Sequence, residues 1–174
     1  MIEFKRILVP LDGSSLSEEA LPLATTLARK FGSEIVLLRT WEVSMPPTSE
    51  YSGVYLGWMD EVYAHACEEA ESYLKAQQDA LRRQGLDVEI VLLGDHSPAE
   101  KIIDTAVSQN VDLIVMSTHG RSGLARWALG SVADKVVRHS PCPVLLNRQP
   151  VEPVNEPQLE GDARSDRALT NRLA

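Results

Sequence analysis

Two short polar segments of this chain have the residue types that bind a hydroxylated or anionic small molecule. The first is Asp12-Gly13-Ser14-Ser15, directly after the apolar run 6–10, and the second runs from Ser117 to Gly123, directly after the apolar run 111–116. A carboxylate accepts hydrogen bonds from ribose hydroxyls, whereas glycines let backbone N–H groups approach a phosphate closely. The two segments together therefore suit a nucleotide.

The elements that must position these segments alternate between short apolar runs and helical patterns. The patterns predict strands at 6–10, 35–38, 88–93, 111–116 and 144–146, and helices at 17–31, at 60–84, from Pro98 onward and at 132–139. Near-continuous apolar strands separated by helices indicate a parallel sheet that is covered on both sides. We therefore expect an α/β fold, Rossmann-like, with a single five-stranded parallel sheet and helices on both faces.

In such a sheet, ligands bind beyond the carboxyl ends of the strands, where successive helices go to opposite faces. The two polar segments follow two such strand ends, so we expect them to meet in one site. Gly130-Ser131 then opens the helix at 132–139, whose first amides and dipole favour an anion.

Each of these features also has a purely structural explanation. Asp12-Gly13-Ser14-Ser15 is typical of any strand-to-helix turn with a helix cap. Ser131 and Asp134 have the spacing of a capping box, and Gly120 and Gly123 are ordinary turn residues in this explanation. A carboxylate and two glycine-bearing segments at strand ends seldom occur together by chance, and this conjunction favours a ligand site.

The composition excludes several classes of protein. The chain has 174 residues, 25 acidic and 17 basic, for a net charge of -8. Nucleic acids and anionic membranes are held by clustered Lys and Arg, so a general binder of either is excluded. With 44% hydrophobic but only 5% aromatic residues, the core must be aliphatic. The segment 117–140 nonetheless has four basic residues and one acidic residue, which permits a small, metal-neutralised phosphate ligand.

The chain is expected to form one domain and a tail in the cytoplasm. Its start has no signal-peptide pattern, and no apolar run is long enough to span a membrane. Residues 1–148 are expected to be the domain, and the proline-rich, charge-mixed residues 149–174 a flexible polar tail. Cys67 and Cys142 are too few for a disulfide framework or a zinc set, and we expect buried free thiols.

Two further kinds of residue invite a functional interpretation. Trp41 and Trp58 flank the irregular stretch 43–58, where they could cover a ligand or pack the stretch onto the domain. His119 lies in the second polar segment and could act as a general base. No nucleophile is paired with it by a recognised motif, so we expect a phosphate or backbone contact instead. The other histidines lack metal-ligand spacing.

Two stretches carry a resemblance to a known family, KRILVPLDGSSLSEEAL and MSTHGRSGLARWALGSVADKVVRHSPCPVLL. They resemble the universal stress protein family in its ATP-binding type, and the resemblance runs from Phe4 to Asn147. Nucleotide-binding members share a glycine, two residues, a second glycine, nine residues, and a glycine followed by Ser or Thr. Gly120 and Gly130-Ser131 fit this pattern, and Ser117 stands where the first glycine is found.

The resemblance implies that ATP lies between the ends of the first and fourth strands. Asp12 would contact the ribose or the adenine edge, Met116 would pack on the base, and the glycine-bearing segments would hold the phosphates. Mg²⁺ would be carried by the phosphates rather than by protein ligands. The implied binding residues are Pro10, Leu11, Asp12, Thr40, Met116, Ser117, His119, Gly120, Arg121, Ser122, Gly123, Gly130, Ser131 and Val132.

The function implied by the resemblance is that of an ATP-binding stress-response sensor or signalling module. The chain lacks a P-loop with its lysine, so we expect at most slow ATP turnover and no catalytic residue. The resemblance also implies a homodimer through the last strand, which begins at Pro143 and ends at Asn147. Two alternatives stay open: a dimeric interaction protein of the same fold that binds no nucleotide, and a slow ATP hydrolase that uses Asp12 and a bound water.

Overall fold

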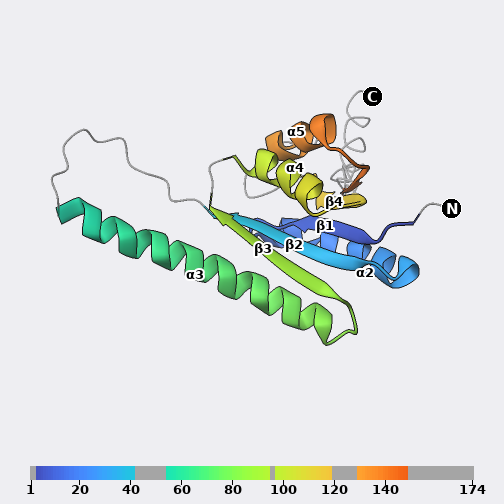
Figure 1. Ribbon diagram of the computed structural model, residues 1–174, viewed down its shortest axis with the longest axis horizontal. Helices are drawn as coiled ribbons and strands as arrows, with labels where there is room; N and C mark the ends of the chain where they lie inside the picture. Colours follow the sequence, from blue (N-terminus) through green and yellow to red (C-terminus); the bar gives the residue numbers. More distant parts are fainter. Residues whose placement is uncertain (1–2, 42–53, 95–96, 119–128, 149–174) are drawn as a thin grey trace, which may run out of the picture.

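The computed structural model describes residues 3–41, 54–94, 97–118 and 129–148, with side chains described from residue 60 onward in the second range (Figure 1). The expected tail, 149–174, lies outside the described residues. Along the chain the elements are β1 (Arg6–Pro10), α1 (Ser15–Glu18), α2 (Ala20–Phe31), β2 (Glu34–Trp41), α3 (Val54–Arg82), β3 (Val88–Gly94), α4 (Pro98–Ser108), β4 (Leu113–Ser117), α5 (Ser131–His139) and β5 (Val144–Asn147).

The strands form one parallel sheet in the order β3-β2-β1-β4-β5. In its centre Ile7 of β1 lies opposite Ile35 of β2 and Leu113 of β4. The chain builds the sheet outward from β1 to β3, crosses back through α4, and continues outward from β4 to β5. The expected five-stranded parallel sheet is confirmed, and its topological switch point lies between β1 and β4.

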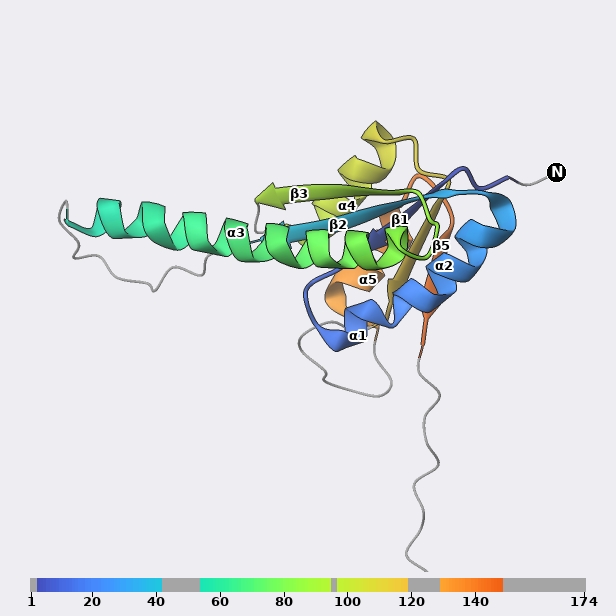
Figure 2. The ribbon, with the colours of Figure 1, turned by 90° about the horizontal axis from the view of Figure 1, so that it is seen from below.

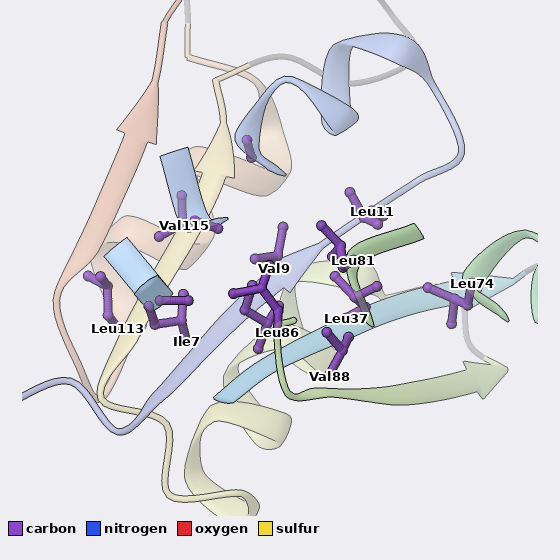
Figure 3. Close-up of a cluster of buried hydrophobic side chains, with 14 residues drawn as sticks. Ile7, Val9, Leu11, Leu37, Leu74, Leu81, Leu86, Val88, Leu113 and Val115 are labelled. Atoms are coloured by element: carbon purple, nitrogen blue, oxygen red, sulfur yellow. The ribbon is translucent and has the colours of Figure 1, made fainter. Parts of the chain in front are cut away.

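Helices cover both faces of the sheet. Figures 1 and 2 show α2 and α3 on one face, and α4 and α5 on the other. The side chains of β1 alternate between these faces, because Ile7 and Val9 are buried with α2 and α3 and Leu8 is buried with α4 and α5. Figure 3 shows the first of these clusters. Every buried hydrophobic side chain of the described residues is aliphatic or Met, as the low aromatic content requires. None of the helices in the described ranges has the length and apolarity of a membrane span.

Two element boundaries differ from the expected ones in ways that shape the site. The helix expected at 17–31 is two helices, because it is interrupted at Glu19 after a first turn that is capped by Ser14. β2 continues to Trp41, although Pro10 at the end of β1 already pairs with Leu38. The last residues of β2 therefore extend past β1 at the carboxyl edge of the sheet.

Candidate functional site

A cavity of about 640 Å³ opens at the carboxyl edge of the sheet. Its walls come from the ends of β1, β2 and β4, from the starts of α4 and α5, and from α3. Nine of the expected binding residues line it: Pro10, Leu11, Asp12, Thr40, Met116, Ser117, Gly130, Ser131 and Val132. The other five lie outside the described residues: His119, Gly120, Arg121, Ser122 and Gly123. The structure thus brings Asp12 of the first polar segment and Ser117 and Thr118 of the second to one cavity.

The turn at residues 11–14, which we call the Asp12 turn, holds a carboxylate at the cavity wall. Asp12 Oδ1 accepts hydrogen bonds from the N–H and the hydroxyl of Ser14, at 2.9 and 2.6 Å. The Ser14 hydroxyl in turn accepts from the Ser17 N–H at 3.2 Å and caps α1. The helix-cap explanation is correct for this turn, and the same hydrogen bonds hold the half-buried Asp12 carboxylate beside the cavity.

Arg39 also lines the cavity, although no motif in the sequence indicated a role for it. Strand alternation places it on the same face of β2 as the buried Ile35 and Leu37. Arg39 is only 7% exposed, and its Nη2 lies 3.6 Å from Glu69 Oε1. Its Nε has no hydrogen-bond partner in the described part of the chain. Arginine is rarely buried without good partners, so this side chain marks the site as clearly as Asp12 does.

Tyr73 of α3 connects Arg39 to α1. The Arg39 Cζ lies 4.8 Å from the centroid of the Tyr73 ring. The Tyr73 phenol donates to Glu18 Oε1 at 2.8 Å, and Gln77 Nε2 donates to the same oxygen at 3.0 Å. Burial raises the pKa of the Tyr73 phenol, and the hydrogen bond to Glu18 raises this pKa further, whereas the Arg39 charge opposes the change. The neutral phenol therefore remains a donor and fixes α1 to α3 beside the cavity.

The start of α5 forms another part of the cavity wall. Gly130 is the N-cap of α5, and its N–H donates to the Thr118 carbonyl at 2.9 Å. The first turn of α5 lines the cavity with Ser131, Val132 and Ala133. The first N–H groups of a helix have no partner within the helix, and together with the helix dipole they favour an anion. This wall can therefore bind a phosphate without a charged side chain.

The capping-box explanation of Ser131 is wrong. Ser131 is the first residue of α5 and Gly130 is its N-cap, with no side-chain capping hydrogen bond. Asp134 instead accepts two hydrogen bonds from Arg138 Nε, at 3.0 and 2.9 Å, and these lower the pKa of the Asp134 carboxyl. The helix cap therefore does not explain the serine at the cavity.

Two side chains at strand ends complete the described walls. Ser117 ends β4, and its hydroxyl is buried with no hydrogen-bond partner among the residues that the structure describes. Trp41 ends β2 and lines the cavity, and it also packs edge to face on Tyr63 with ring centroids 5.9 Å apart. Trp41 is thus placed for both of the roles considered from the sequence, whereas the side chain of Trp58 lies outside the described residues.

The family model of the Universal stress protein family matches residues 3–148, which is most of the chain. The chain belongs to the universal stress protein family. This universal stress protein is 32% identical over 148 residues to the universal stress protein MJ0531 of Methanocaldococcus jannaschii, with 84% of each chain covered.

Solved structures show the same fold. The universal stress protein UspA from Lactobacillus plantarum matches with a TM-score of 0.72 at 23% identity, over 85% of this chain and 100% of the other. A universal stress protein in complex with cAMP matches with a TM-score of 0.61 at 22% identity, over 84% and 98%.

The two cysteines of this universal stress protein are free but half-buried, not buried as expected. Cys67 lies in the outer helix α3 and Cys142 lies just before the edge strand β5, so in the described part of the chain neither is enclosed by a further layer. Burial still raises the pKa of the Cys142 thiol, and a hydrogen bond with Ser140 opposes that change.

The cavity of this universal stress protein suits an elongated ligand with one hydroxylated and one anionic part. Its volume lies within the roughly 300–1,000 Å³ of small-molecule sites. The Asp12 carboxylate is an acceptor for hydroxyl groups at one wall, and the first turn of α5 offers N–H donors at the other. Met116 and Leu11, which also line the cavity, supply apolar surface for a ring.

Proposed function

We propose that this universal stress protein binds ATP with Mg²⁺ in the cavity and acts as a stress-response signalling module with at most slow ATP turnover. The observation that carries the proposal is that the Asp12 carboxylate and the first turn of α5 line one cavity. These are the groups that ribose hydroxyls and phosphates require. The complex of a universal stress protein of the same fold with cAMP supports an adenine nucleotide as the ligand.

The described residues fit each part of that nucleotide. Adenine would lie against Thr40 and Met116, ribose would face Asp12, and the phosphates would lie at the start of α5. The buried hydroxyl of Ser117 would donate to the ligand, which explains why it has no partner among the described residues. Mg²⁺ would be held by the phosphates, whose charge it neutralises. The residues 119–123 are proposed to complete the phosphate site.

The first test is to denature the purified, untreated protein and to separate the released small molecules by chromatography. We expect adenine nucleotide at close to one per chain. Nucleotide-free protein should show a higher Tm with MgATP, because a ligand that binds only the folded state stabilises it, and MgGTP is the matched control. If there is neither retained nucleotide nor a thermal shift, the proposal fails in favour of an interaction protein without a nucleotide.

Turnover distinguishes a signalling module from a hydrolase. We expect wild type and Asp12→Ala to hydrolyse ATP far more slowly than the typical enzyme median of about 10 per second. A wild-type rate near that median, lost in Asp12→Ala, would instead identify a hydrolase that uses Asp12 and a bound water.

We also propose a homodimer that forms through β5. This strand is an edge of the sheet, and Leu145 on it is 37% exposed. An edge strand presents backbone donors and acceptors to which a second copy can pair. Light scattering after size-exclusion chromatography should give a dimer mass for wild type and a monomer mass for Leu145→Lys. A monomeric wild type would refute the dimer.

We place this function in the cytoplasm, where free thiols such as Cys67 and Cys142 stay reduced. Fractionation of cells should recover the protein in the cytoplasmic fraction. Recovery from the membrane or the medium would contradict this placement.

A further inference from the structure

The guanidinium of Arg39 lies beside the Asp12 turn at Gly13. A Cβ atom on Gly13 would lie 3.1 Å from Arg39 Nη2, 3.2 Å from Cζ and 3.5 Å from Nη1. Because three guanidinium atoms are at similar distances, Gly13 lies over the plane of the group rather than at its end. The φ of Gly13 is +84°, a backbone conformation that favours glycine, and a Cβ atom there would have to displace the Arg39 guanidinium by a few tenths of an ångström.

Arg39 is itself held from α3. Its Cζ lies at a cation–π distance from the Tyr73 ring, and the Tyr73 phenol donates to Glu18 of α1. The Asp12 turn is therefore packed at Gly13 beside the guanidinium of Arg39. The helix that follows the turn is tied at Glu18 to the same tyrosine on which Arg39 stacks.

The surroundings of Arg39 are not those of a stabilising ion pair. Its side chain is 8% exposed, whereas that of Glu69, at 3.6 Å, is 67% exposed. Its Nε has no hydrogen-bond partner in the described ranges. A buried guanidinium with one long, solvated ion pair stabilises a fold no better than an apolar residue of similar volume would. A flat, charged side chain at position 39 is better explained by the Asp12 turn beside it and by the cavity that it lines.

We infer that Arg39 is a positioning residue of the cavity, whose guanidinium supports the Asp12 turn and sets the place of the Asp12 carboxylate opposite the ribose of the ligand. The ribose part rests on the proposed function, whereas the support of the turn is a property of the protein alone. Lysine cannot replace Arg39 in this role, because an ammonium has no planar face. Methionine keeps much of the length but neither the plane nor the charge.

Hydrogen exchange of the ligand-free protein tests the support of the turn. We expect amides at residues 11–18 to exchange about tenfold faster in Arg39→Met and in Arg39→Lys than in wild type, with the sheet unchanged. The Leu11 N–H, which donates to the Leu38 carbonyl at 2.7 Å, is a direct reporter. Arg29→Met is the matched control, because Arg29 is exposed and bonds Gln84. Unchanged exchange at 11–18 in Arg39→Met overturns the inference.

Calorimetric titration with ATP and with its 2′-deoxy and 3′-deoxy analogues tests the placement of the carboxylate. Wild type should bind ATP about tenfold more tightly than the weaker analogue, and Asp12→Ala should lose this preference. Arg39→Met should reduce the preference to about twofold, and Arg29→Met should keep it. A full preference in Arg39→Met overturns the inference. A wild type that binds no nucleotide refutes the proposed function instead, and hydrogen exchange then decides the role of Arg39.

Discussion

One arginine lies at the amino ends of the parallel strands, which we call the amino edge of the sheet, and another lies at their carboxyl ends, the carboxyl edge. The two arginines differ strongly in their hydrogen-bond partners. Arg6, at the start of β1, donates to carboxylates of Glu34 and Glu89 and to the side chain and carbonyl of Gln109. The hydrogen bond to Glu34 and the charges of both carboxylates raise the pKa of Arg6. Arg39, near the end of β2, is more deeply buried, but it has Glu69 at 3.6 Å and an Nε without a partner in the described part of the chain.

Other polar groups at the two edges differ in the same way. Asp112, at the amino edge, accepts from the Lys5 N–H at 2.7 Å and from the Arg6 N–H at 2.9 Å. Ser117, at the carboxyl edge, has a buried hydroxyl with no partner among the described residues. A buried polar group without a partner lowers stability. The polar groups at the amino edge therefore stabilise the fold, whereas those at the carboxyl edge lower its stability and are left for a ligand to bind.

The largest effect, on the affinity for ATP, is expected from Gly130→Val. A side chain at the N-cap of α5 would occupy the space through which a phosphate reaches the first amides of the helix. The affinity for ATP, measured by calorimetry, should fall about 100-fold, as for the loss of two charge-assisted hydrogen bonds. Val137→Ala is the control, because Val137 lies in the same helix but is exposed and does not line the cavity, and it should leave the affinity unchanged. Equal affinities in the two variants would show that the start of α5 does not bind the phosphates.

The two arginines should separate stability from binding. Arg6→Met should lower the free energy of unfolding by about 2 kcal/mol, because it removes several charge-assisted hydrogen bonds that are partly exposed to water. Arg39→Met should change it by less than about 1 kcal/mol, because Glu69 is exposed and remains solvated. Urea denaturation measures both. If Arg39→Met lost as much stability as Arg6→Met, the contrast between the two edges would be wrong.

A pair of glycines isolates the contact between Arg39 and the Asp12 turn. Gly13 and Gly32 both have positive φ, 84° and 68°, so alanine at either costs about 1 kcal/mol in backbone strain. A Cβ on Gly13 would also meet Arg39, whereas one on Gly32 has nothing within 4 Å. Gly13→Ala should therefore lower the free energy of unfolding by roughly 1 kcal/mol more than Gly32→Ala does. Urea denaturation of the Gly13→Ala, Arg39→Met double variant checks the cause, because removal of the guanidinium should remove the extra loss of stability. If the extra loss stays in the double variant, it does not come from Arg39.

The smallest effect, on the pH dependence of the stability, is expected from Tyr73→Phe, and it is expected only at high pH. The pKa of Tyr73 is raised in the folded protein above its unfolded value of about 10, so the folded state keeps a proton that the unfolded chain loses. The stability from this proton is present below about pH 10 and is lost as the pH rises further. Between about pH 9 and 11, wild type should therefore lose stability more steeply than Tyr73→Phe, by at most one proton. Parallel curves would mean that the phenol ionises as freely as in the unfolded chain.

The apolar pattern predicted the strands but ended β2 too early. A charged residue at Arg39 ends an apolar run, so the pattern stopped at 35–38. The strand continues because its pairing with β3 extends from Ile35 to Trp41, which lies opposite Gly94. The alternation from Ile35 through Leu37 to Arg39 was the signal that could have predicted a buried arginine.

The start of α5 was misassigned because spacing alone cannot show where a helix begins. Ser131 and Asp134 fit a capping box, but the N–H of Gly130 donates to the carbonyl of Thr118, which directly follows β4. This hydrogen bond joins residues separated by the segment 119–129 and fixes the place of Gly130. Gly130 is the N-cap because its carbonyl accepts the first hydrogen bond of α5, from the Asp134 N–H at 2.8 Å. By contrast, the sequence did indicate a helix cap within residues 12–15, because Asp12, Ser14 and Ser17 are all close in sequence, and the structure identifies Ser14 as that cap.

The sequence by itself determined the parallel α/β fold, the family and the two polar segments, because apolar runs, turn residues and motifs are local in the chain. It also predicted that these segments would meet, since carboxyl ends of parallel strands share one edge. Only the tertiary structure decided that Arg39 lies against Gly13 and Tyr73. That contact depends on β2 extending past β1 and on α3 packing beside it, and no local pattern contains this information.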